Sequence, residues 1–274
     1  MEYGKRALIW ASVLALVLCQ TIPNTFCSPN EESLPGVFDV ASNGQLAVSV
    51  MDMQKCDSVQ GFFLALGLVV ENMQNITIQV DPSTFNVQDS HGEMINASKE
   101  YALKYPLIHC EVNPGEVVVG SLGFKLNEEA MPAMFLDQSS GLRIRLDKAS
   151  KPPGIPHSLG VPIKTGDCIV GIEGLSQSQD GRILQIDYLL KNFGPGVMLL
   201  EPRDYGRFGN LIDASGFSIP ASDYKMLGPA VPPGGTLEGY LTYTIPYGSD
   251  PLYLIFWPPE EDAVLFDLGL QSRR

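Results

Sequence analysis

Histidine is the residue type best suited to acid–base catalysis and metal binding, and this sequence holds only three of them. His91 falls in a predicted turn and His157 in a proline-rich segment. None of the three histidines stands in the His-Glu-x-x-His spacing of a zinc site. The Gly-x-Ser-x-Gly pattern of a hydrolase nucleophile is also absent. The sequence therefore predicts no catalytic residues, no cofactor and no enzyme.

Carboxylates offer a second kind of chemistry, because calcium binds the oxygen atoms of acidic loops. Asp81, Asp89 and Glu93 gather around one predicted turn, and residues 260–262 form a second acidic group. Neither group has the Asp-x-Asp-x-Asp-Gly spacing of a calcium loop. We interpret both as solvated surface charge, with a calcium site as the alternative.

Five cysteines are present, and none stands in a Cys-x-x-Cys pair, so zinc or redox chemistry is not predicted. Cys56 and Cys110 lie in the first half of the chain and are the pair expected to form a disulfide in an exported protein. Cys168 is then an odd thiol, or a partner of Cys27. Buried unpaired cysteines are the alternative.

Two N-glycosylation sequons occur, Asn75-Ile-Thr77 and Asn96-Ala-Ser98. In an exported chain, Asn75 and Asn96 are candidate glycan sites if the organism has the machinery. Chance is the alternative, since two sequons are ordinary at this length.

Aromatic residues are the best candidates for a contact surface, and the second half of the chain is rich in them. Most must fill a core. Four stand near loops that contain glycine or proline, where an exposed ring would mark recognition: Tyr205, Phe208, Tyr247 and Trp257.

The N-terminus predicts export. Lys5 and Arg6 precede an apolar run at residues 7–18, which is the pattern of a secretory signal. The run is shorter than the roughly 20 residues that span a bilayer. We expect residues 1–27 to be a signal peptide and the protein to be extracellular or in the cell envelope. An uncleaved N-terminus or a lipid on Cys19 is the alternative, and the only membrane attachment expected.

The net charge of −13 bears on the class of partner. A surface this acidic repels nucleic acid and anionic lipid, so a nucleic-acid-binding function is not predicted. Solubility alone accounts for the charge, and a basic partner is a further interpretation.

An internal repeat with an offset of about 120 residues is the strongest pattern in the chain. Each copy has an asparagine at a strand end, a Pro-Gly turn and a Gly-x-Leu-x-aromatic strand. These read Asn72, Pro114-Gly115 and 120–124 in the first copy, and Asn192, Pro233-Gly234 and 239–243 in the second. Turn and strand packing explain all of these positions, so we expect them to be framework.

Short alternating segments between glycine, proline, asparagine and aspartate turns predict strands throughout. The expected strands cover 45–53, 61–71, 76–80, 85–87, 117–126, 142–146, 167–175, 182–192, 198–200, 239–245, 252–257 and 264–268. Residues 95–105 are the one modest helix candidate. The fold class is therefore all-β, as two tandem immunoglobulin-like antiparallel β-sandwiches at 37–147 and 166–270. Residues 148–165, with four prolines, are expected to be a semi-rigid linker.

At these residues the chain resembles a family of secreted, telokin-like, immunoglobulin-like domains of unknown function, which includes a mycobacterial immunoprotective antigen. The shared pattern runs from Asn72 through Phe-x-Val-x-Asp at 85–89 to the strand after Pro114-Gly115. The second copy replaces the Phe-x-Val-x-Asp core with a glycine- and arginine-containing stretch at 204–209. The resemblance implies a secreted sandwich, often displayed on a cell envelope, with no common catalytic residues.

These observations predict a secreted or cell-surface, non-catalytic binding or adhesion module for an unknown protein or glycan partner. The alternative is a structural component of the cell envelope, and an extracellular enzyme or a protease inhibitor comes after it.

Overall fold

The structure is a computed structural model that describes residues 33–58, 61–98, 105–127, 129–200, 209–226, 230–256, 258 and 263–270. The expected signal peptide at 1–27 lies outside these residues. Strands make up nearly all of the regular structure in the described residues, and the short 3-10 helix η2 (Pro82–Thr84) lies between two of them. The predicted all-β fold class is confirmed. The described part of the chain has no helix of the length and hydropathy that crossing a membrane requires.

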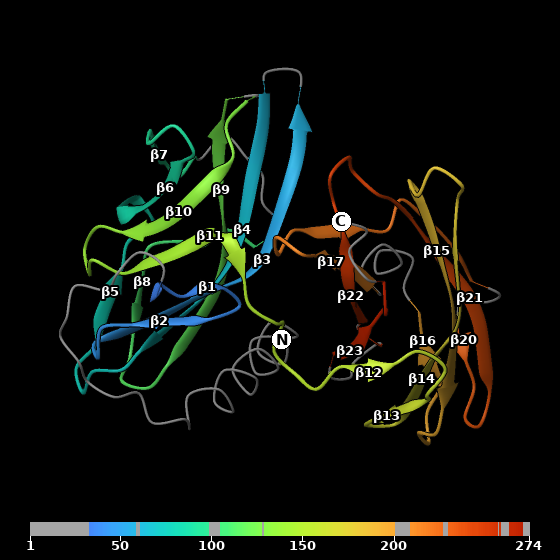
Figure 1. Ribbon diagram of the computed structural model, residues 1–274. Coiled ribbons are helices and arrows are strands. Elements are labelled where there is room, and N and C mark those ends of the chain that lie inside the picture. The colour runs from blue at the N-terminus through green and yellow to red at the C-terminus, as the bar shows by residue number, and fades with distance from the viewer. Residues whose placement is uncertain are drawn as a thin grey trace. The chain divides into compact units, whose positions relative to one another are not determined.

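The chain divides into two compact units. Unit 1 comprises residues 1–153 with 215–217, and unit 2 comprises 154–214 with 218–274. The ribbon in Figure 1 runs from blue and green strands in unit 1 to yellow and red strands in unit 2. Each unit is described by itself below.

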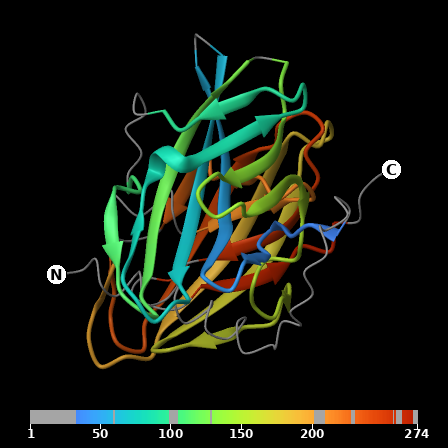
Figure 2. The same cartoon turned by 90° about the vertical axis from the view of Figure 1, so that its left-hand side faces the viewer.

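Unit 1 is built from two larger sheets and one small one. The first sheet has the order β1 (Gly36–Val37), β11 (Arg143–Ala149), β10 (Pro132–Asp137), β6 (Phe85–Asp89) and β7 (Met94–Asn96). The second has the order β2 (Val40–Ser42), β3 (Leu46–Ser58), β4 (Gly61–Asn72) and β9 (Val117–Leu126). β5 (Ile78–Val80) pairs with β8 (Cys110–Val112). The long β3–β4 hairpin can be followed in both Figure 1 and Figure 2.

Unit 2 has the same plan. Its first sheet has the order β12 (His157–Ser158), β23 (Val264–Asp267), β22 (Pro251–Phe256), β17 (Gly209–Asp213) and β18 (Ser218–Pro220). The second has the order β13 (Ile163–Thr165), β14 (Cys168–Gln177), β15 (Ile183–Asn192), β21 (Thr236–Thr244) and β19 (Asp223–Met226). β16 (Met198–Leu199) pairs with β20 (Ala230–Val231).

The strand orders of the two units correspond position by position. In each unit the first strand pairs in parallel with the last, as β1 with β11 and β12 with β23, while the other strand pairs are antiparallel. In unit 2, β19 occupies the sheet edge beside β21. At the same edge in unit 1, beside β9, the described residues form isolated bridges at Ser98 and Pro106. Apart from β19, the two units therefore share one strand order, which includes a parallel pair in each.

Alternation of apolar and polar residues predicted the long hairpin strands of both units but missed β10 and β17, which lie inside the first sheet of each unit. The expected strand at 117–126 has the observed bounds of β9, and the expected strand at 45–53 lies within and just before β3. The helix expected from residue 95 is wrong at its start, because Met94–Asn96 forms β7 and pairs with β6. The expected linker at 148–165 contains β12 and β13, which pair with β23 and β14. Residues 157–158 and 163–165 of the expected linker therefore belong to the sheets of unit 2.

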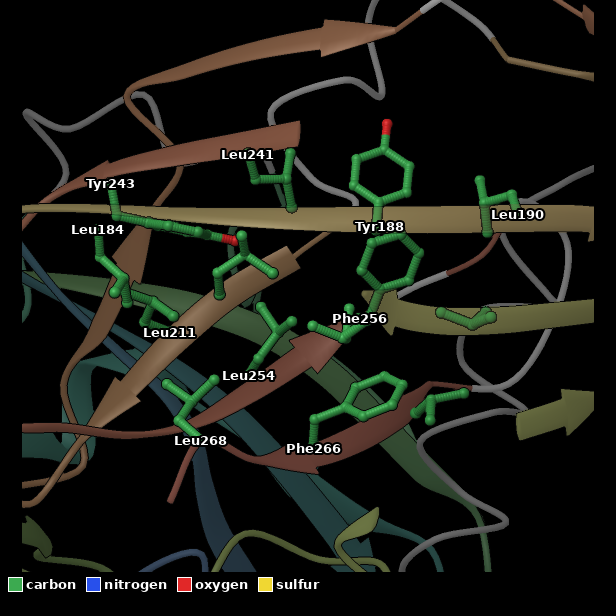
Figure 3. Close-up of a cluster of buried hydrophobic side chains, with 14 of the residues drawn as sticks. Leu184, Tyr188, Leu190, Leu211, Leu241, Tyr243, Leu254, Phe256, Phe266 and Leu268 are labelled. Atoms are coloured by element: carbon green, nitrogen blue, oxygen red, sulfur yellow. The ribbon is translucent and has the colours of Figure 1, made fainter. Parts of the chain in front are cut away.

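Aromatic rings fill the core of unit 2. Tyr188 from β15 lies against Phe256 from β22, with ring centroids 5.3 Å apart, so the contact joins the two sheets. Figure 3 shows this pair among the leucines of β15, β21 and β22. Tyr243 from β21 is buried as well, and its hydroxyl donates to the Gly209 carbonyl at 3.0 Å. Burial raises the pKa of the Tyr243 hydroxyl well above its usual value, so it stays protonated and keeps this bond.

The asparagine shared by the two copies is a buried clamp. In unit 1 the Asn72 amide donates to the carbonyls of Ile76 and Val112, at 2.7 and 2.9 Å. The Asn72 side-chain oxygen accepts from the Gln74 amide at 2.9 Å. The side chain therefore ties the loop after β4 to β8, and the expectation that it holds the turn backbone is confirmed.

Asn192 makes the same three bonds in unit 2. Its amide donates to the carbonyls of Gly196 and Val231, both at 2.8 Å, and its side-chain oxygen accepts from the Gly194 amide at 2.8 Å. In both units the main-chain carbonyl of the asparagine also accepts from the glycine of the Pro-Gly turn, Gly115 or Gly234. The repeated motif is thus one hydrogen-bonded assembly.

A β-bulge occurs at the corresponding place in both units. In each unit an aspartate on one strand faces a glycine on the next, but the strand that carries the aspartate differs. In unit 1 Asp52 of β3 faces Gly67 of β4, and in unit 2 Gly174 of β14 faces Asp187 of β15. A Cβ on Gly67 would lie 2.9 Å from the Cβ of Asp52, so the pair in unit 1 has no room for a second side chain.

This crowding gives a testable exchange. Gly67→Asp alone is expected to destabilise unit 1 by about 1–3 kcal/mol through overpacking. Adding Asp52→Gly creates the arrangement of unit 2 and is expected to recover most of that loss. Urea unfolding of the single and double variants measures the recovery. A double variant no more stable than Gly67→Asp would contradict the explanation.

Candidate functional site

Tyr247 is the described member of the predicted contact surface, and it is 85% exposed. It stands between Pro246 and Gly248 in the loop that joins β21 to β22. The other three predicted members, Tyr205, Phe208 and Trp257, lie outside the described residues. A tyrosine ring this exposed contributes little to a core, so it is the starting point for a site.

The β14–β15 hairpin places Arg182 beside this loop. The Ile245 amide donates to the Arg182 carbonyl at 2.7 Å, so the two loops are joined through the backbone. The Ser249 amide then donates to the Pro246 carbonyl, which closes a turn around Tyr247, and Gly248 supplies the positive φ of 78° that this turn needs.

Asp180 holds the hairpin turn in shape. One of its carboxylate oxygens, Oδ1, accepts from the Ser178 hydroxyl at 2.6 Å and from the Arg182 amide at 3.1 Å. The bond from Ser178 and that from the Arg182 amide lower the pKa of Asp180. The turn is therefore fixed by its own acid, as the Ser-x-Asp-Gly sequence predicts.

The Arg182 guanidinium lies over the Tyr247 ring, with its central carbon 3.9 Å from the ring centroid. Stacking of this kind contributes about 0.5–1 kcal/mol at an exposed site and fixes the plane of the guanidinium. The Nε atom of Arg182 is buried without a hydrogen-bond partner. Together Arg182 and Tyr247 form a rigid feature at the start of β15, called here the Arg182–Tyr247 surface.

A second exposed feature lies at the other end of β15, and the sequence interpretation missed it. Phe193, Val197 and Leu199 follow the Asn192 clamp and are exposed, Leu199 by 66%. Lys191 lies over the Phe193 ring at 4.8 Å. Their position beside Gly194-Pro195-Gly196 could have predicted this exposure, because apolar residues within a glycine–proline loop are seldom buried.

The same loop of unit 1 is also apolar. Met73 and Ile76 follow the Asn72 clamp and are exposed. The sequon residue Asn75 lies between them and is exposed too, while Thr77 donates to the Asn113 side chain at 3.1 Å. The second sequon residue, Asn96, is exposed at the end of the edge strand β7. Exposure is what glycosylation requires, and modification of either residue stays a prediction.

The structure does not bring Cys56 and Cys110 together. Cys56 faces Phe63 in the β3–β4 hairpin, whereas Cys110 faces Val80 close to the Asn72 clamp and is a free thiol. Phe63 and Asn72 are nine residues apart on β4, which is about 30 Å along a strand. A disulfide needs Cα atoms within about 7 Å, so the expected bond does not form in this structure.

Cys168 lies in the core of unit 2, where its thiol donates to the Ile169 carbonyl at 3.6 Å. Cys27 lies outside the described residues, so their pairing stays a prediction.

The acidic residues that were candidates for a metal site each make their own local hydrogen bonds. Asp81 caps η2 through the Ser83 amide, and Asp89 accepts from the amides of His91 and Glu93. Among the described residues no group of three histidine, cysteine or acidic side chains could hold a metal ion. The acidic residues 260–262 lie outside that part of the chain.

The histidines occupy three unrelated places. His91 stands in the turn after β6 with its Nδ1 3.9 Å from Asp89. His109 Nε2 is 2.7 Å from the side-chain oxygen of Gln79, and the His157 ring lies edge-on to Phe266. We therefore take the Arg182–Tyr247 surface, which contains a residue predicted from the sequence, as the candidate functional site.

Comparison with known families gives a match over one unit. Residues 37–139 match a family model described as a domain of unknown function, DUF4352. The matched residues lie within unit 1. No curated protein matches the chain.

Solved structures provide more distant similarities. MPT63, a secreted protein from Mycobacterium tuberculosis, is 16% identical over 41% of this chain and 95% of its own, with a TM-score of 0.33. The yjhA protein from Bacillus subtilis is 11% identical over 41% of this chain and 98% of its own, with a TM-score of 0.31. A conserved domain protein from Bacillus anthracis is 9% identical over 93% of this chain and 96% of its own, with a TM-score of 0.25. None of the three descriptions names a ligand or an activity.

Proposed function

We propose that this protein is an exported, non-catalytic binding module made of two tandem copies of one immunoglobulin-like sandwich. The basic and apolar N-terminus supports export to the cell surface or the medium. The shared strand order and the two asparagine clamps support descent of both units from one domain. The clamp and turn residues serve the framework, so the binding function is assigned to loops where the units differ.

The Arg182–Tyr247 surface is the contact site of this module. The observation that carries the assignment is an exposed tyrosine whose ring is held in place by an arginine. Tyrosine and arginine are enriched among the residues that contribute most to protein–protein binding. A ring fixed before binding loses less conformational entropy in the complex than a mobile one.

Replacing Tyr247 tests this function. The chain from residue 28 onward is used to probe an array of proteins, peptides and glycans, and each ligand found is titrated against Tyr247→Ala. We expect at least a ten-fold loss of affinity, because truncation of a central interface tyrosine costs about 2 kcal/mol or more. Folding should change by only about 0.5–1 kcal/mol, the contribution of the exposed stacking.

Tyr105→Ala in unit 1 is the matched control, since it removes a tyrosine that is also exposed. It is expected to leave binding unchanged. Ligands that bind Tyr247→Ala as tightly as the unaltered chain would contradict the assignment of the site. The structural alternative makes a different prediction, namely that cell fractionation recovers the protein as a stoichiometric component of the envelope.

A further inference from the structure

Arg182 is a cation in an acidic chain, and its charge is the smallest of the influences that lower the pKa of the neighbouring Asp180 carboxyl. In the described part of the molecule it forms no ion pair, whereas Arg145 forms one with Asp147 at 2.6 Å. The nearest acid in sequence, Asp180, is occupied by the Ser178 hydroxyl and the Arg182 amide. The turn thus uses its own carboxylate for shape and leaves the guanidinium to an external group.

The geometry of Arg182 defines how an anion can approach. Tyr247 covers one face of the guanidinium, and the buried Nε cannot take part in binding. The Arg182 side chain as a whole is half-buried, so the terminal end of the guanidinium is the part left for an external group. Two parallel N–H groups on a fixed plane match the two oxygens of a carboxylate, which would bind end-on.

The neighbouring hydroxyl groups favour a peptide over a glycan. Ser178 bonds within its turn, and Ser249 donates to Asp213. Ser222 donates to the Thr242 carbonyl and accepts from Thr244. A glycan requires several free donors as well as acceptors, and the donors of these hydroxyl groups are already used within the protein. A peptide requires one ionic contact and apolar surface, which Arg182 and the free face of Tyr247 provide.

We propose that the Arg182–Tyr247 surface binds an acidic segment of a protein partner, with the Arg182 guanidinium holding a Glu or Asp carboxylate end-on and the Tyr247 ring contacting the adjacent side chain. This inference rests on the proposed binding function and names the chemistry of its ligand. Because the chain carries a net charge of −13, a highly acidic partner is repelled overall. A segment with a single carboxylate beside apolar residues is the ligand that fits.

The test uses two apolar pentapeptides with blocked ends that differ only in a central Glu or Gln. The Nε–H resonance of Arg182 in the chain from residue 28 onward is followed by NMR during titration at low salt. We expect a saturable shift with the Glu peptide and at least ten-fold weaker binding of the Gln peptide. Arg182→Gln should lose the binding of the Glu peptide, seen through the Tyr247 ring signals. Arg182→Lys should weaken it, because an ammonium ion cannot form the parallel pair of bonds.

Lys225→Gln is the matched control, since it removes one exposed positive charge from β19 in the same unit. Equal losses from Lys225→Gln and Arg182→Gln would overturn the proposal in favour of unspecific charge. Trigalacturonate is titrated in parallel, and tighter binding of this acidic sugar than of the Glu peptide would assign the site to glycans instead. If Tyr247→Ala loses ligands on the array while the Glu peptide fails to bind, the peptide proposal is wrong and the binding function stands.

Discussion

Asn192→Ala is expected to destabilise unit 2 by about 3–4 kcal/mol, because three hydrogen bonds are lost at a buried position and their partners gain none. The Val231 carbonyl, which accepts one of these bonds, belongs to a residue that is itself buried. Urea unfolding followed by tryptophan fluorescence measures the change. Trp257 is the only tryptophan after residue 27, so the signal comes from unit 2.

Two further variants test whether the loss of stability comes from the clamp hydrogen bonds or from the loss of any polar side chain. Asn210→Ala removes one bond to the Ser218 hydroxyl and is expected to cost about 1 kcal/mol. Asn192→Asp keeps the acceptor for the Gly194 amide but turns a carboxylate oxygen toward two carbonyls, so it should be at least as destabilising as Asn192→Ala. If Asn192→Ala and Asn210→Ala lower the free energy of unfolding by the same amount, the hydrogen bonds of the clamp do not explain why both units have this asparagine.

Local patterns in the sequence predicted β15 well because only one face of this strand is buried, whereas β3 is buried on both faces from Leu46 to Met51. Alternation over β3 and over β15 is visible in the residues themselves, and the Pro-Gly turns mark where β9 and β21 begin. The bulge at Asp52 was not predictable in this way, since it depends on which residue of β4 faces which residue of β3. The proposed Cys56–Cys110 bond failed for the same reason, because register along β4 sets their separation.

The candidate site was half predicted. Tyr247 was chosen because it lies between proline and glycine, a local signal that the structure supports by its exposure. Arg182 was not chosen, because its contact with Tyr247 joins loops that are 65 residues apart in the sequence. Phe193 and Leu199 were overlooked because aromatic and apolar residues in a β-rich chain were assigned to the core by default. The exposure of a residue depends on which distant segments pack against it, and a local sequence pattern does not contain that information.

Gly239→Ala is expected to destabilise unit 2 by about 2–4 kcal/mol, because the added methyl group has no room. Its Cβ would lie 2.5 Å from the Lys225 carbonyl oxygen in β19 and 2.7 Å from the Tyr188 hydroxyl oxygen. The Lys225 oxygen belongs to the backbone of β19, and the Tyr188 hydroxyl belongs to the core ring that joins the two sheets. Removing the steric clash therefore requires a shift of either the edge strand or the core. Differential scanning calorimetry and amide hydrogen exchange in β19 measure the two consequences.

Gly120→Ala in unit 1 tests whether this position has the same role in both copies. A Cβ on Gly120 would lie 2.7 Å from the Cα of Leu107, so the backbone of a covering segment again approaches the glycine of the Gly-x-Leu-x-aromatic strand. Gly196→Ala is the control, since its Cβ would meet open space and its cost should be below about 1 kcal/mol. Equal melting temperatures for Gly239→Ala and Gly196→Ala would show that close approach is not what the repeated glycine serves. A selective loss in Gly239→Ala and Gly120→Ala would instead assign the glycine of each copy to the packing of a chain segment against the sheet edge.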